Sequence, residues 1–327
     1  MSVYFATVVA LGGFVFGFDA SVISGVVGFV TNEFGLNEWQ QGFVVSAPTL
    51  GAVIGSFFAG PCADRFGRKK VIIFVAALYL ISALFSAFAV SYEMLVTARI
   101  IGGFAFSSLV LAPMYIAEIS PSNLRGKMIS INLFIIVIGL SAAYFTNYYL
   151  LQLSGGTSEL ATTLGITENV WRWMLGLEIL PAAIFLLLLF TIPESPRWLV
   201  VNKKVEQAKV VLTRLFPEQS VDNAIAELQK DNKEELPPLL TRVKMLFSNH
   251  IGFILLVGVV VAVIQQITGI NAIFFYAPSI FEQSGIGQDA AFSQAVLVGV
   301  INVVFTVVAM MLVDKLGRKP LLLAGLA

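Results

Sequence analysis

The stretch GPCADRFGRKK at residues 60–70 recurs in related form as MLVDKLGRK at residues 311–319, and this repeat indicates the architecture of the chain. Both stretches follow a long apolar run and share the pattern D-[RK]-x-G-R-K, with Asp64 and Asp314 at equivalent positions. A motif that recurs at such a long period indicates two structural units of the same kind. Parallel repeats of six membrane spans are a known transporter architecture. We therefore predict an all-α membrane protein built from two related bundles.

The composition agrees with a membrane protein. Of the 327 residues, 57% are hydrophobic and 12% are charged, whereas soluble domains have about 25% charged residues. A formal net charge of zero provides no basic field for nucleic acid, and the single cysteine, Cys62, excludes an internal disulfide. Apolar stretches of about 20 residues, enough to cross a bilayer as helix, occur at 3–30, 41–61, 71–91, 93–118, 128–151, 171–192, 251–282 and 290–313.

The basic residues are segregated along the chain. All but two of the 20 lysines and arginines follow spans 2, 4, 6 or 8. In the loops on the opposite side, all charged residues are acidic. Lysine and arginine mark cytoplasmic loops. We therefore expect a multi-pass protein of the inner or plasma membrane with its N-terminus in the cytoplasm.

Three segments follow from the span pattern. Residues 1–192 are predicted to form a complete six-span bundle, and residues 193–249 a cytoplasmic linker with short amphipathic helices near 203–216, 220–235 and 239–248. Residues 250–327 would be the start of a second bundle, with spans 7 and 8 and the onset of span 9. On this interpretation the chain is incomplete, because the first bundle continues for four more spans beyond its copy of the motif.

Three ionisable residues fall inside the predicted spans. Asp19 lies in span 1, Arg99 in span 4 and Glu178 in span 6, all in the outer half of the bilayer. Charges at this depth are costly and mark functional sites by default. Desolvation favours a neutral carboxyl while a nearby arginine favours a charged one, which gives such a cluster a basis for proton coupling. The alternative is a static salt bridge that holds three helices together.

A stripe of amides follows in spans 7 and 8. Gln265, Gln266, Asn271 and Asn302 lie in otherwise apolar segments, and amides suit sugar hydroxyls because they both donate and accept hydrogen bonds. The aromatic residues Phe16 and Tyr276 could supply apolar faces for a sugar ring. The competing explanation is ordinary hydrogen bonding between helices.

The repeated motif itself suggests a gate. A carboxylate that ends one helix can pair with basic residues that open the next, and such a cluster can latch one conformation. The residues concerned are Gly60, Asp64, Arg65, Gly67, Arg68, Asp314, Gly317 and Arg318. A plain topological stop signal of basic residues is the simpler alternative.

Five motifs together resemble the sugar porter family of the major facilitator superfamily. They are GPCADRFGRKK (60–70), PMYIAEISPSNLRG (113–126), PESPRWL (193–199), QQITGINAIFFYAP (265–278) and DKLGRKP (314–320). Two further stretches, GFDASVISG (17–25) and residues 299–321, are most similar to the bacterial xylose–proton symporter group.

The resemblance implies a transporter rather than an enzyme. It implies movement of a monosaccharide by alternating access with proton symport, no cofactor or metal beyond the coupling proton, and a monomer in the lipid bilayer. Asp19 and Arg99 match the proton-coupling pair, the four amides match sugar ligands, and Glu118, Arg125, Glu194 and Arg197 match a cytoplasmic charge network. Leu140 and Phe275 depart from the family pattern, so the sugar stays open. A passive sugar facilitator, or a non-transporting fragment or sugar sensor, is the alternative.

Overall fold

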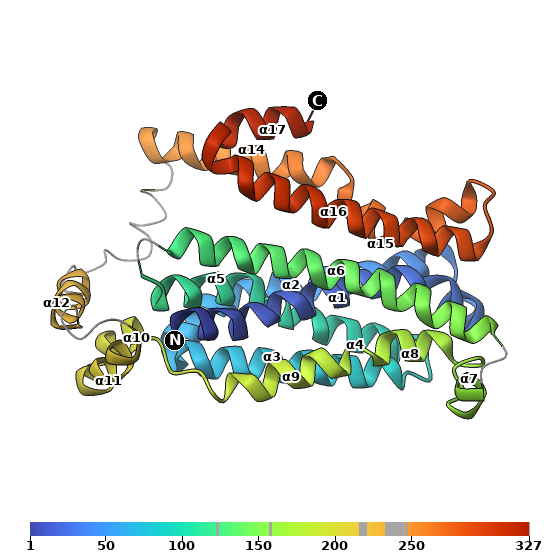
Figure 1. Cartoon of the computed structure of the whole chain (residues 1–327), viewed down its shortest axis with the longest axis horizontal. Helices are drawn as coiled ribbons and strands as arrows, with labels where there is room; N and C mark the ends of the chain where they lie inside the picture. The colour runs from blue at the N-terminus through green and yellow to red at the C-terminus, as the bar shows by residue number, and fades with distance from the viewer. Residues whose placement is uncertain (122–123, 157–158, 216–220, 233–244, 246–247, 327) are drawn as a thin grey trace.

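The computed structural model describes residues 1–326 except 122–123, 157–158, 216–220, 233–244 and 246–247 (Figure 1). In the described part of the chain every regular element is a helix. Eight helical stretches are long and apolar enough to cross a membrane, and they coincide with the eight predicted spans: Ser2–Phe34, Glu38–Phe66, Arg68–Ala87, Tyr92–Ile119, Arg125–Gly155, Val170–Leu189, Ile251–Gln283 and Gln288–Val313. The prediction of an all-α membrane protein is confirmed.

Five of the spans are single helices: α1 (Ser2–Phe34), α2 (Glu38–Phe66), α3 (Arg68–Ala87), α6 (Arg125–Gly155) and α16 (Gln288–Leu316). Three are interrupted, as α4 (Tyr92–Ala105) and α5 (Ser108–Ile119), α8 (Val170–Gly176) and α9 (Ile179–Leu189), and α14 (Asn249–Ile267) and α15 (Ile270–Gln283). A short helix, α7 (Glu159–Thr163), precedes the sixth span, and α17 (Arg318–Leu326) follows the eighth.

Helix α1 lies at the centre of the first bundle, because 78% of its most apolar window is buried. It packs most extensively against α6, and the contact depends on two glycines. A Cβ atom on Gly17 would collide with the carbonyl oxygen of Ile136, and one on Gly139 would collide with that of Phe14. Small residues at such crossings let two backbones approach closely, so the glycines fix the distance between α1 and α6.

Two hydrophobic clusters fill the bundle and meet along α1. One contains α1 residues up to Val15 and includes Tyr79, Tyr115 and Phe185 from neighbouring helices. The other begins on α1 at Phe18 and includes residues of α4 and α8. Asp19 therefore lies where the two clusters meet, and it is inaccessible to solvent.

Three linker helices follow the first bundle: α10 (Pro196–Val201), α11 (Val205–Leu215) and α12 (Val221–Asn232). The first two pack through Trp198, Leu199 and Ala208. Helices α11 and α12 fall within the predicted helices 203–216 and 220–235, whereas α10 was not predicted from the sequence. The predicted third linker helix, 239–248, lies largely outside the described residues.

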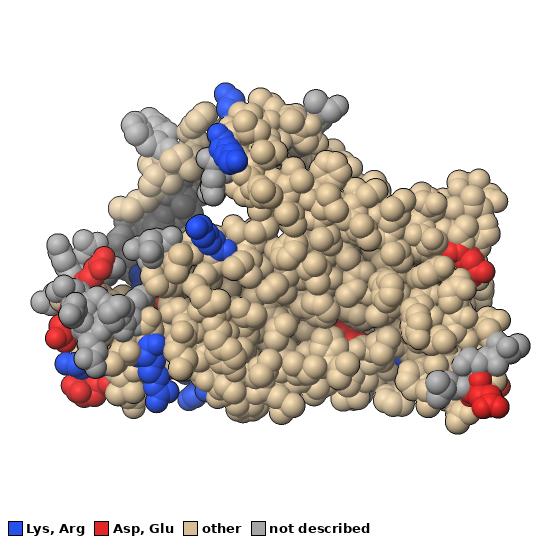
Figure 2. Space-filling model, in the orientation of Figure 1, with Lys and Arg blue, Asp and Glu red and all other residues tan. Residues whose placement is uncertain are grey.

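The C-terminal helices contact the first bundle through α6 and α1. Ser141 on α6 donates a hydrogen bond to the carbonyl of Gly299 on α16 at 2.9 Å, and Tyr144 donates to the carbonyl of Phe274 on α15 at 2.6 Å. Figure 1 shows α15 and α16 against the bundle at one end of the molecule, while α14 and α17 lie farther from it at the other. Figure 2 shows that charged side chains gather toward the two ends, with a largely uncharged band between them.

Candidate functional site

A buried ion pair joins α1 to α4. Arg99 donates through Nη1 to the carboxylate of Asp19, and through Nη2 to the backbone carbonyl of Asp19 at 3.2 Å. Both side chains are almost completely inaccessible to solvent. Breaking such a pair by removing one partner costs several kcal/mol, roughly 3–5, because an uncompensated charge is left behind.

Glu178 completes the cluster from the sixth span. It lies in the turn between α8 and α9 and is 1% exposed. Among the described residues, Asp19 Oδ2, Glu178 Oε1 and Arg99 Nε have no hydrogen-bond partner. The structure therefore places the three predicted ionisable residues in one buried region of the first bundle. Among the described hydrogen bonds and ion pairs, only Asp19 and Arg99 of the three contact each other directly.

Small and polar residues surround this cluster. A Cβ atom on Gly102, one turn after Arg99, would lie 3.1 Å from Asp19 Oδ2. Tyr79 and Ser108 form a buried hydrogen bond of 2.9 Å, and Ser82 donates to the carbonyl of Ala98 at 2.8 Å. Tyr79 was not singled out from the sequence, because an isolated tyrosine in an apolar span gives no signal of its own.

The amide stripe is only partly assembled. Asn271 Nδ2 donates to Gln266 Oε1 at 2.9 Å, across the break that Gly269 makes in a left-handed conformation with φ 73°. Gln265 is exposed on α14, and Asn302 is half-buried on α16. The described contacts join neither of these two to the ion pair or to each other.

The two aromatic candidates lie on opposite sides of the inter-bundle contact. Phe16 is one turn before Asp19 on α1 and packs edge-on against Phe106, with ring centroids 4.6 Å apart. Tyr276 has non-helical backbone angles (φ −123°, ψ 16°) two residues before Pro278, so α15 is kinked at this residue. A kink next to proline is expected, because proline interrupts the helical hydrogen bonds.

The motif after α2 forms a compact charge cluster. Arg68 pairs with Asp64 at 2.8 Å and with Glu118 at 3.1 Å, and donates to the carbonyl of Ala63. Glu194 accepts hydrogen bonds from the backbone of Lys69 (3.0 Å) and Ser195 (2.9 Å) at the start of α3 and α10. The cluster thus ties spans 2, 3 and 4 to the first linker helix.

The glycine of the motif has the same backbone role in both copies. Gly67 (φ 101°, ψ 150°) and Gly317 (φ 81°, ψ 166°) each end a span, and each donates its N–H to the carbonyl four residues earlier, Ala63 and Val313 respectively. Positive φ values of this kind are accessible mainly to glycine. The repeat seen in the sequence is therefore also a repeat of local structure.

Other predicted gating residues are not in the cluster. Gly60 faces open space, and Arg65 lies over the ring of Phe66. Arg125 and Arg197 are exposed, and neither forms an ion pair with any described residue. The side chains of Asp314 and Arg318 lie outside the described part of the structure.

A second polar cluster joins the opposite ends of spans 1, 3 and 6. Glu33 accepts hydrogen bonds from Trp171 Nε1 and from Arg172 (3.0 Å), and Arg172 donates to the carbonyl of Ala89 at 2.6 Å. The guanidinium of Arg172 also stacks over Trp171, 4.3 Å from the ring centroid. We call Glu33, Trp171 and Arg172 the outer clasp. The sequence held a signal for it, because Arg172 and Arg99 are the two basic residues that do not follow an even-numbered span.

Comparisons with known proteins agree with this architecture. The profile of the sugar (and other) transporter family matches residues 5–327. The chain is 37% identical to the glucose transporter GlcP of Staphylococcus epidermidis and 38% identical to the arabinose-proton symporter of Bacillus subtilis, covering 97% of this chain in each case. The chain spans about two thirds of the length of these relatives, 67% and 66%.

A solved structure with the same fold is the partially occluded inward open conformation of the xylose transporter XylE from E. coli. It superposes with a TM-score of 0.81 at 34% identity, covering 97% of this chain and 74% of that one. The family is one of transporters and not of enzymes. The chain therefore belongs to the sugar (and other) transporter family, the sugar porters of the major facilitator superfamily.

Proposed function

We propose that this chain carries the proton site and part of the sugar site of a monosaccharide transporter that works by alternating access with proton symport. The observation that carries the proposal is the buried Asp19–Arg99 pair with Glu178 beside it. Proton uptake by one carboxyl would release the guanidinium, and proton loss would restore the pair. A cluster with two such states can couple a proton to a conformational change.

The arrangement of the two bundles supports alternating access. The contacts between α6 and α16 and between α1 and α15 join the bundles, and α15 carries Asn271 and is kinked at Tyr276. We infer that Gln265, Gln266, Asn271 and Asn302 bind sugar hydroxyls, with Phe16 and Tyr276 against the ring. We infer further that the Arg68 cluster acts as the cytoplasmic latch, which stabilises one conformation of the transporter. We also infer that the N-terminus is cytoplasmic and that the protein is a monomer. No cofactor other than the proton takes part in the proposed cycle.

Uptake by the chain in proteoliposomes tests the proposal. With an inward proton gradient, we expect labelled D-xylose, L-arabinose or D-glucose to rise above the external concentration, and a protonophore to abolish the accumulation. In the Asp19→Asn variant the sugar should at most equilibrate, because the amide does not titrate. Asp289→Asn, the same chemical change at an exposed residue in the first turn of α16, is the matched control and should keep the accumulation.

Other results would favour the alternatives. Equilibration of sugar by the unmodified chain without accumulation would indicate a passive facilitator. Sugar binding measured by calorimetry, without any uptake, would indicate a non-transporting or sensing protein. Unchanged accumulation in Asp19→Asn would contradict the role given to Asp19.

A further inference from the structure

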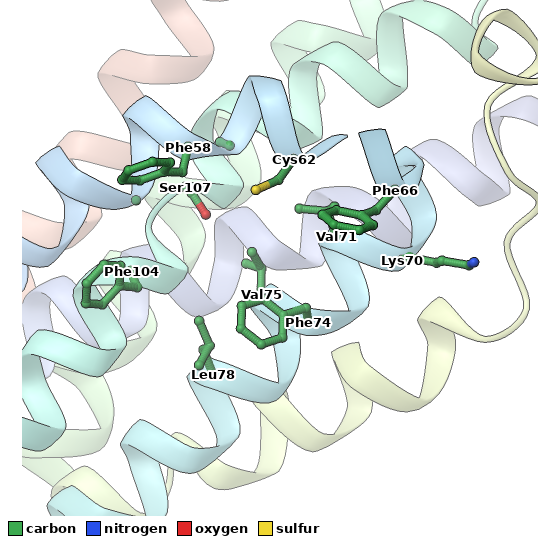
Figure 3. Close-up of a pocket in the computed structure, with 12 residues that line it drawn as sticks. Phe58, Cys62, Phe66, Lys70, Val71, Phe74, Val75, Leu78, Phe104 and Ser107 are labelled. Carbon is green, nitrogen blue, oxygen red and sulfur yellow. The ribbon is translucent and has the colours of Figure 1, made fainter. Parts of the chain in front are cut away.

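An apolar groove runs between α2 and α3 on the outside of the first bundle (Figure 3). Its volume is about 460 Å³, within the range of ligand sites in proteins. The floor contains Ala59 and Val75, which are almost fully buried, and the walls contain Phe58 and Phe74, each 62% exposed. Both helices cross the membrane, so the groove opens toward the hydrocarbon of the bilayer rather than toward water.

The groove has a charged end. Lys70 lines it and lies at one end of the row of side chains in Figure 3. The guanidinium of Arg65 lies 5.3 Å from the ring centroid of Phe66, another lining residue. No described carboxylate lies within 4 Å of Lys70 or Arg65, whereas Arg68, between them in sequence, is fully engaged. Two uncompensated cations therefore flank one end of an apolar groove.

We propose that this groove binds one anionic glycerophospholipid, with an acyl chain between α2 and α3 and the headgroup phosphate between Lys70 and Arg65. An aqueous solute would gain little from an apolar groove that faces lipid, and a polypeptide segment would leave the two cations unpaired unless it were acidic. An acyl chain fits the apolar walls through dispersion contacts. Basic pockets between membrane helices on the cytoplasmic side are suited to anionic headgroups.

The lipid would reinforce a weakly packed part of the bundle. Helices α2 and α3 contact each other much less than each contacts α4. They are joined directly at Gly67, the centre of the Arg68 cluster. A bound acyl chain would fill the space between them and hold the two helices beside this cluster. The site involves neither the buried ion pair nor the amides, so it does not depend on the proposed transport activity.

The chain contains its own reporter, because its one cysteine, Cys62, lines the groove. We would measure the rate of Cys62 alkylation by N-ethylmaleimide in detergent micelles containing phosphatidylglycerol or phosphatidylcholine with identical acyl chains. Phosphatidylglycerol should protect Cys62 at a lower concentration than phosphatidylcholine. Each basic residue near an anionic lipid contributes about 1 kcal/mol, which corresponds to about a fivefold change in affinity. Lys70→Gln and Arg65→Gln should each raise the half-protecting concentration of phosphatidylglycerol by about fivefold.

Matched variants inside and outside the groove distinguish lipid binding in the groove from general effects of a substitution. Lys127→Gln removes an exposed cation at the start of α6, outside the groove, and should leave the protection unchanged. Leu78→Trp should fill the groove and abolish retention of phosphatidylglycerol in native mass spectrometry. Phe85→Trp, on an exposed part of α3 outside the groove, should retain the lipid.

Three results would overturn the proposal. One is equal protection by the two lipids, and another is retention of phosphatidylglycerol in Leu78→Trp at the level of the unmodified chain. The third is protection without added lipid that rises with protein concentration, because it would mean that a second copy of the chain covers the groove.

Discussion

At the scale of single residues, the two polar clusters of the first bundle differ in how much water reaches them. The Asp19–Arg99 pair is inaccessible, whereas the outer clasp is partly open, with the side chains of Glu33 and Arg172 exposed by 39% and 23%. An ion pair in contact with water contributes little by itself, about 0–1 kcal/mol. The clasp is stronger than its ion pair alone, because Arg172 also donates to the carbonyl of Ala89 and stacks on Trp171.

We predict that Arg172→Ala lowers the free energy of unfolding by about 2 kcal/mol, because a hydrogen bond from a charged group is worth roughly 1.5–3 kcal/mol. Glu33→Gln should cost less, about 1 kcal/mol, since the amide oxygen still accepts from one of the two donors while the amide NH2 cannot accept from the other. Denaturant titration in detergent, followed by tryptophan fluorescence, measures both changes. Glu168→Gln, at an exposed residue without a described contact, is the control. Equal costs for Arg172→Ala and Glu33→Gln would show that the ion pair accounts for the whole clasp.

At the scale of helices, the crossing of α1 and α6 is set by backbone contact and not by side chains. We predict that Gly17→Ala or Gly139→Ala destabilises the bundle by about 1–3 kcal/mol, the usual cost of overpacking a core, because each added methyl group would meet a carbonyl oxygen of the other helix. The change is measured as a lower midpoint of thermal unfolding in detergent.

Gly28→Ala is the matched control on α1. A Cβ atom there would meet no atom within 4 Å, so this variant should be neutral or stabilising by up to about 1 kcal/mol through helix propensity. If Gly17→Ala proved as stable as Gly28→Ala, the two helices could not be as close as described.

The helices also show which features of the fold can be predicted from the sequence. Their existence follows from length and hydropathy, because a helix of about 20 apolar residues crosses the hydrocarbon core with its backbone groups hydrogen-bonded within the segment. The positions of the breaks within three of the spans follow less directly from the sequence. Gly269 marks the break in the seventh span, and Gly176 and Pro181 flank the break in the sixth, whereas no glycine or proline adjoins Phe106–Ser107 in the fourth. The break in the fourth span depends on neighbouring helices, which a single span cannot reveal.

The same limit applies to the site. Depth along each span placed Asp19, Arg99 and Glu178 at compatible levels, and the structure brings them together. Depth along a span does not indicate which helices face each other. The sequence therefore did not predict the clasp at Arg172. It also did not predict the hydrogen bonds from the hydroxyl groups of Ser141 and Tyr144 to the C-terminal helices. For the amides, the sequence predicted a common level, but contacts between α14, α16 and the first bundle depend on packing that no local pattern encodes.

At the scale of the whole molecule, the distribution of charge predicts which way the protein crosses the membrane. Eighteen of the 20 basic residues follow even-numbered spans in the sequence, and Figure 2 shows charged side chains toward both ends of a largely uncharged band. Because lysine and arginine near span ends are retained on the cytoplasmic side, reversing the protein would require many cations to cross the bilayer. The linker helices α10, α11 and α12 should therefore be cytoplasmic, and the loop before α16 should face outward.

Single-cysteine labelling tests this orientation. In a Cys62→Ser background, we predict that Asp289→Cys reacts with a membrane-impermeant maleimide in intact cells, whereas Lys203→Cys reacts only after the cells are opened. Both residues are exposed, so a difference in labelling reports the side of the membrane and not burial. Labelling of the opened cells provides the control that both variants are folded and reactive. Reaction of Lys203→Cys in intact cells would place the linker outside, and it would contradict both the orientation and the assignment of the Arg68 cluster to a cytoplasmic latch.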